Sequence, residues 1–89
     1  MTNSQSIISG TVLDPDGQPV AEARVYFIDG PVPLPDIAVL TNRSGEFTLT
    51  APAPGTYKIG CSADGFASIT VTVNITTVQN VQVEIQLKR

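Results

Sequence analysis

The chain has 89 residues, of which 42% are hydrophobic and 15% are charged, and its net charge at pH 7 is −3. This length provides one hydrophobic core and leaves no room for a second domain, and the hydrophobic fraction is that of a folded chain rather than a disordered one. The five basic residues are scattered along the sequence, so we expect no clustered basic surface for nucleic acid phosphates.

Residues 1–6 are predicted to form a disordered N-terminal tail. They have neither the basic region nor the apolar region of a signal peptide. No apolar run in the chain approaches the length of a transmembrane helix, so no membrane insertion is expected. The sequence therefore indicates either a cytoplasmic protein or one module of a longer exported or cell-surface protein.

Apolar and polar residues alternate with a period of two from end to end, and this pattern predicts strands. The first two strands are predicted at residues 7–13 and 23–29, separated by a turn at residues 14–17. Three prolines at positions 31, 33 and 35 then break the pattern, because proline has no backbone N–H to donate. A third strand is predicted at residues 37–41, a tight hairpin turn at 42–45, and a fourth strand at 46–50 with Phe47 and Leu49 inward.

Three further strands complete the predicted domain. The fifth, at residues 56–62, places Tyr57, Ile59 and Cys61 on one face. The sixth and seventh, at residues 69–75 and 81–87, are interpreted as a last hairpin. Seven short strands separated by turn signals predict two packed antiparallel sheets, and hence an all-β Greek-key sandwich over residues 7–89.

Six short segments match one family in order and spacing: SGTV at 9–12, DPDGQPV at 14–20, ARV at 23–25, TNRSGEF at 41–47, PGTY at 54–57 and DGF at 64–66. With them the sequence resembles the carboxypeptidase regulatory-like domain family, whose seven-stranded sandwich is transthyretin-like (prealbumin-like) and related to the B-type repeats of collagen adhesins. The resemblance implies an accessory domain. It also implies inward positions for Phe47 and Tyr57 and turn roles with positive φ for four glycines: Gly17, Gly45, Gly55 and Gly65.

The residues predict no catalytic site, metal site or cofactor. The chain has no histidine, which is the usual general base and the commonest transition-metal ligand; the hydrolases and dioxygenases with transthyretin-like folds depend on histidine. Asp14 and Asp16 belong to a turn rather than to a calcium loop, because the distal acid position of such a loop falls on Val25. Cys61 is interpreted as a small buried hydrophobic residue.

Two features are candidates for an interaction surface. The first is the proline-rich loop, which presents Val32 and Leu34 on a stiff backbone, although a rigid connector would have the same composition. The second is the nearly uncharged outer face of the last two strands, which is poorly protected against edge pairing and could dock a neighbour. A plain solvated face is the alternative. Its residues are Thr70, Thr72, Asn74, Gln82, Glu84 and Gln86.

These observations favour a non-enzymatic accessory module that acts as a structural spacer or as an interaction domain for a protein partner or a neighbouring domain. One alternative is a starch-binding-like carbohydrate module. Such modules stack sugars on exposed aromatic rings, and here only Tyr26 could point outward. The other alternative is a self-associating subunit of the transthyretin type. The sequence leaves both alternatives and the oligomeric state open.

Overall fold

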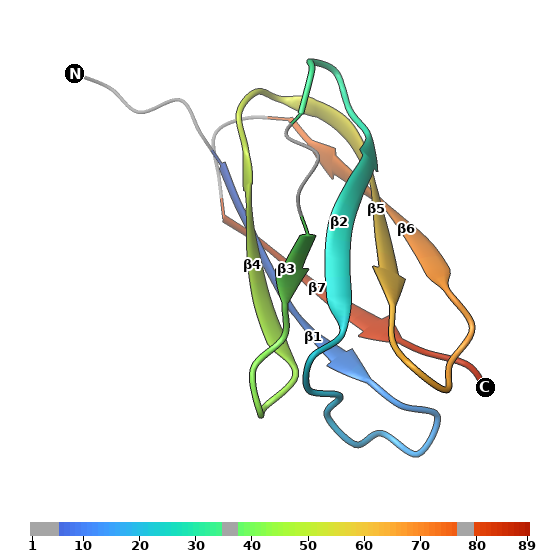
Figure 1. Ribbon diagram of the computed structural model, residues 1–89. Helices are drawn as coiled ribbons and strands as arrows, with labels where there is room; N and C mark the ends of the chain where they lie inside the picture. Colours follow the sequence, from blue (N-terminus) through green and yellow to red (C-terminus); the bar gives the residue numbers. More distant parts are fainter. Residues whose placement is uncertain (1–5, 35–37, 77–79) are drawn as a thin grey trace.

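The structure is a computed structural model that describes residues 6–34, 38–76 and 80–89. Seven strands form in these residues, as the alternation predicts (Figure 1). Their bounds are Ser6–Leu13 (β1), Arg24–Asp29 (β2), Ala38–Leu40 (β3), Glu46–Ala51 (β4), Gly55–Ser62 (β5), Ile69–Ile75 (β6) and Asn80–Gln86 (β7). In this described part of the chain, no helix is long and apolar enough to cross a membrane.

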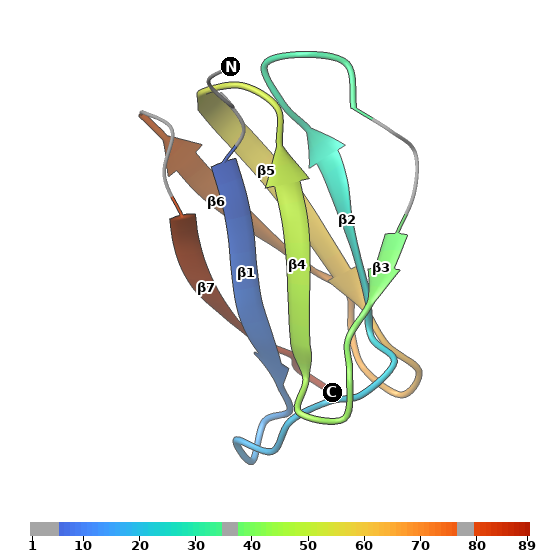
Figure 2. The same ribbon diagram turned by 90° about the vertical axis from the view of Figure 1, so that its left-hand side faces the viewer.

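The strands form two sheets that pack face to face, with the orders β4-β1-β7 and β3-β2-β5-β6. Figure 2 shows the three-stranded sheet in front of the four-stranded one. The predicted all-β sandwich is thereby confirmed. Four strand pairs are antiparallel as predicted, but β1 and β7 are parallel, with Ile7 opposite Asn80 and Leu13 opposite Gln86. Alternation fixes the face of each side chain and carries no information on the direction of a distant partner strand.

Two predicted hairpins are wrong. The last two strands do not pair, because β6 belongs to the four-stranded sheet and β7 to the three-stranded one. The turn at residues 42–45 exists, but it joins β3 of one sheet to β4 of the other. A sharp turn between two alternating segments looks the same in sequence whether the chain returns within one sheet or crosses to the opposite sheet.

The boundaries of the strands differ from the predictions by small amounts. The first strand begins at Ser6, one residue earlier than predicted, and residues 1–5 of the predicted tail lie outside the described residues. The third strand ends at Leu40, so Thr41 lies after it rather than in it as predicted. Ile37, its predicted first residue, lies outside the described residues. The Thr41 amide donates to the carbonyl of Ala23, and the amide of Glu22 donates to the carbonyl of Thr41.

The core lies between the sheets and contains the inward side chains of both. Tyr57 is the largest fully buried side chain, and its ring centroid lies 5.3 Å from that of Phe27. The inward positions predicted for Phe47, Leu49, Tyr57, Ile59 and Cys61 are confirmed. Burial of these apolar surfaces supplies the main favourable free energy of folding.

The direction of the first and last strands determines where the chain enters and leaves the sandwich. Because β1 and β7 are parallel, the chain enters at one pole and leaves at the other. The loops at residues 14–20, 42–45 and 63–66 lie at the pole where β1 and β7 end (Figure 1). We call this end the loop pole.

Candidate functional site

Two loops at the loop pole have the same geometry. In each, an aspartate or asparagine side chain accepts two backbone N–H bonds: Asp14 Oδ1 from Asp16 and Gln18, and Asn42 Oδ1 from Ser44 and Glu46, all at 2.9 Å. A glycine with positive φ follows three residues after the capping side chain, as the resemblance implies. This is the three-residue loop in which a type I turn precedes a left-handed residue.

Gly45 shows why the second loop needs glycine. A Cβ atom at this position would lie 2.6 Å from the carbonyl oxygen of Val12 and 3.1 Å from the amide of Val20. The Val12 amide also donates to the Gly45 carbonyl at 2.7 Å. The turn is thus packed directly against the backbone of β1 and of the first loop, which fixes the two loops relative to each other.

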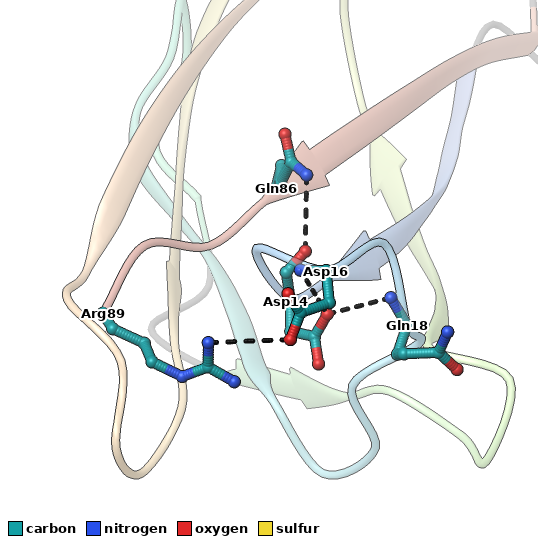
Figure 3. Close-up of polar contacts among 5 residues, drawn as sticks. All are labelled: Asp14, Asp16, Gln18, Gln86 and Arg89. Atoms are coloured by element: carbon teal, nitrogen blue, oxygen red, sulfur yellow. Dashed lines mark hydrogen bonds and ion pairs between the residues drawn. The ribbon is translucent and has the colours of Figure 1, made fainter.

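The carboxylates of the first loop have structural partners, as Figure 3 shows. Asp14 caps its own loop, and Asp16 lies 3.8 Å from Arg89 in an exposed ion pair. Gln86 Nε2 donates to the Asp14 carbonyl at 3.4 Å, and the Arg89 guanidinium also lies over the ring of Phe66 at 5.6 Å. Among the described residues, no three or more His, Cys, Asp or Glu side chains come together in a way that could hold a metal ion.

Thr41 holds the loop pole to the four-stranded sheet, and sequence reasoning did not single it out. Its hydroxyl donates to the carbonyl of Val20 at 2.6 Å and accepts from the amide of Ala23 at 2.9 Å, in a buried position. Its backbone bonds with Glu22, which has a φ of 60° and is the one residue other than glycine with a positive φ in the described chain. A threonine at the end of a strand pattern gives no signal for this role.

Cys61 is fully buried in the core, as its inward position predicted. Burial raises the pKa of its thiol from 9.0 to about 11, because a thiolate would lose its hydration there. A thiol held neutral in this way is a poor nucleophile. Cys61 therefore acts as a core residue.

The raised pKa predicts a loss of stability at alkaline pH. In the unfolded chain the thiol ionises near its ordinary pKa of 9.0, whereas in the folded chain it stays neutral up to about pH 11. Below about pH 9 the thiol is protonated in both the folded and the unfolded chain, so the stability is intact. Between about pH 9 and 11 the thiol ionises only in the unfolded chain, and this favours unfolding. We expect the free energy of unfolding to fall by about 2–3 kcal/mol across the window. Urea titrations at several pH values measure this, and Cys61→Ala should lack this component of the pH dependence.

The surface residues predicted from sequence fall into three separate places. Val32 and Leu34 are partly buried, and Leu34 packs against the core beside Gly30 and Tyr57. The residues of the last two strands are exposed but do not form one face. Thr70, Thr72 and Asn74 lie on the outer face of the four-stranded sheet, and Gln82, Glu84 and Gln86 lie on that of the three-stranded sheet.

A broad, open depression of about 860 Å³ is lined by residues of the three-stranded sheet and, beside them, by Val39, Leu40 and Asn42 of β3 and the turn after it. Its central row pairs Glu46 with Thr11 and Thr11 with Glu84, so a hydroxyl lies between two exposed carboxylates. Ser9, Thr48 and Gln82 form the neighbouring row. These two rows are polar and contain two carboxylates, whereas Val39, Leu40, Phe47 and Val83 make another part of the lining apolar.

The outer face of the four-stranded sheet is different in character. Tyr26 lies across Gly60, where a Cβ atom would come within 2.5 Å of the tyrosine ring. Ile28 and Leu40 are 51% and 61% exposed on either side of it. Among the described residues of the paired strands, the charged ones at outward register positions are Arg24, Lys58 and Asp29, which pairs with Lys58 across a bulge in β2. Tyr57 is buried, so Tyr26 is the tyrosine available to the surface.

Comparison with known proteins establishes the family. A model of the carboxypeptidase regulatory-like domain matches residues 7–88. The chain belongs to this family. Carboxypeptidase regulatory-like domains are non-catalytic domains. No curated protein matches the chain.

Several solved structures resemble this carboxypeptidase regulatory-like domain in fold. Catechol 1,2-dioxygenase from Acinetobacter sp. ADP1 has a TM-score of 0.73 at 14% identity, over 100% of this chain and 54% of that one. A streptococcal ancillary pilin has a TM-score of 0.72 at 14% identity, over 99% and 33%. A type II cohesin–X-dockerin complex from Acetivibrio cellulolyticus has a TM-score of 0.68 at 15% identity, over 92% and 56%. These identities show a shared fold, and the chain spans only a third to somewhat over half of each protein.

Proposed function

We propose that this carboxypeptidase regulatory-like domain is a non-catalytic connecting module that holds protein elements joined to its two ends at a fixed separation. The parallel pairing of β1 with β7 carries the proposal. The eight residues of β1 span about 27 Å at the usual rise per residue. Elements attached before β1 and after β7 are therefore kept apart by at least the length of the sheet.

The same pairing suits the module to carry tension. A pull on the two ends draws β1 and β7 in opposite directions along their axes. The evenly spaced bonds of the parallel ladder, over seven residue pairs, then resist together. In a geometry that peels one strand from its end, these bonds would break one after another.

The comparisons and the chemistry of the chain support a structural role. One protein with a similar fold is a pilin, and another belongs to a protein complex. The chain has no histidine. At the loop pole Asp14 caps a turn, and Asp16 and Asp64 each pair with an arginine. An enzymatic activity that persists through purification and is lost with a point substitution in this domain would contradict the proposal.

Single-molecule stretching tests the connecting role directly. In one arrangement the handles are attached at the two chain ends, which loads β1 against β7 in shear. In the other they are attached at the chain's C-terminal end and at Gln18→Cys, an exposed position at the loop pole, which peels β1 from β7. We expect a several-fold higher unfolding force in the first arrangement. Equal forces in the two arrangements would contradict a load-carrying β1–β7 ladder.

A further inference from the structure

The four outer strands of the sandwich differ in how well their free edges are protected. Natural sheets protect an edge by keeping it short or by placing charge, proline or a bulge on it. β3 has only three residues, β4 contains Glu46 and leads into Pro52, and β7 contains Glu84. β6 has seven residues without charge, proline or glycine, and its register with β5 is unbroken.

The free edge of β6 is available over its whole length in the described structure. β5 occupies one side of β6, and none of the described strands pairs with the other side. The nearest backbone pairing is the bridge between Ala67 and Lys88, which lies before β6 begins. An uncharged strand in which β-branched apolar residues alternate with threonine and one asparagine is a strong template for another strand.

We propose that β6 pairs antiparallel with β6 of a second copy of this chain, about a two-fold axis at Thr72. In this register Thr72 faces its own copy and Thr70 faces the partner's Asn74. On the inner side, Val71 faces the partner's Val73. Polar side chains thus meet polar ones, and apolar side chains meet apolar ones, as favourable cross-strand pairs require. Ile69 and Val71 are only partly buried in one copy, and the pairing would bury more of their side-chain surface.

The charges near the axis permit this pairing. Lys58 is next to Thr72 on the outer face, so it is the charge that the pairing brings closest to its own copy. The two lysines would be three strand spacings apart, or about 14 Å, which exceeds the screening length of about 8–10 Å at physiological salt. Glu46 and Glu84 belong to the other sheet. Self-pairing therefore buries no charge.

The association is expected to be weak and reversible, because one strand edge provides less contact area than the roughly 800 Å² per partner of a stable interface. It involves neither end of the chain, so it is independent of the connecting function. Sedimentation equilibrium from about 10 μM to about 1 mM covers the range expected for such an interface. The apparent mass should rise from 9.4 kDa toward twice that value.

Matched lysine substitutions assign the association to β6. Thr72→Lys places two ammonium groups at the axis and should raise the dissociation constant by about tenfold or more. Thr48→Lys adds the same charge at an exposed threonine of β4 and should change nothing. A monomer at every concentration, or equal effects of both substitutions, would overturn the proposal. So would a monomer that binds an unrelated extended peptide at this edge.

Cysteine substitutions within β6 test the register. Directly opposite residues of antiparallel strands have Cα atoms about 4.5–5.5 Å apart, which suits a disulfide. Thr72→Cys should therefore form an intermolecular disulfide readily. Thr70→Cys would be about 13 Å from its copy, four residues away along the strand, and should not. Crosslinking of both variants at the same rate would overturn the register. The native Cys61 is buried and does not compete.

Discussion

Replacing Gly10 with valine is expected to lower the free energy of unfolding by about 3 kcal/mol or more, a larger effect than ordinary core overpacking. Gly10 is the central residue of the three-stranded sheet, between Phe47 of β4 and Val83 of β7. A Cβ atom there would overlap the carbonyl oxygen of Val83 and lie 2.8 Å from the Phe47 ring. The ring can rotate away, but the carbonyl can move only if β7 shifts relative to β1.

Urea unfolding followed by circular dichroism measures this effect. Ser9→Ala is the matched control, because it changes the neighbouring residue of β1, whose side chain faces outward, and should shift the stability by no more than about 0.5 kcal/mol. Gly10→Val should also reduce the unfolding force when the chain is pulled from its ends, since it weakens the same ladder. A Gly10→Val protein as stable as the parent would mean that the three-stranded sheet repacks without cost.

Removing the Tyr57 side chain is the second large perturbation. Tyr57→Ala should cost about 3–5 kcal/mol, because it empties the largest fully buried site of the core. Tyr57→Phe isolates the hydroxyl, which donates to the Ala53 carbonyl at 2.5 Å and accepts from the Ala53 amide at 3.1 Å. This pair ties the start of β5 to the proline-rich turn before it, in the manner of a tyrosine corner.

Loss of the hydroxyl alone should cost about 1–3 kcal/mol, since the partly buried Ala53 groups lose their partner. Thermal unfolding of Tyr57→Phe beside Tyr26→Phe separates this effect from a general effect of losing a phenol. Tyr26 lies on the outer face of the sheet and has no such bond within the described part of the chain, so its substitution should be nearly neutral. Equal losses in the two variants would show that the corner contributes nothing of its own.

The sequence was sufficient to locate the strands and the buried side chains, because a period of two directly reports which residues face the core. It could not specify the pairing of the strands. β6 and β7 have the clearest alternation in the chain, yet they belong to different sheets. Sheet membership depends on packing between distant segments, such as the seven-residue ladder between β1 and β7.

The loop pole was predictable only in part. The turns at Asp14 and Asn42 follow from local chemistry, since each side chain bonds to amides of its own loop. The role of Thr41 depends on Val20 and Ala23, which lie about twenty residues earlier. The contact of Arg89 with Phe66 likewise joins segments that no local pattern connects.

The start of β1 and the end of β7 lie at opposite poles, and this restricts how a gene can reuse this domain. Insertion into a surface loop of a host protein requires ends that lie close together, and here the start of β1 and the end of β7 are separated by the length of β1. Duplication in tandem has no such requirement, because the end of β7 in one copy can connect directly to the start of β1 in the next copy. The fold is therefore suited to tandem arrays, in which the end-to-end length of the protein grows in proportion to the number of copies.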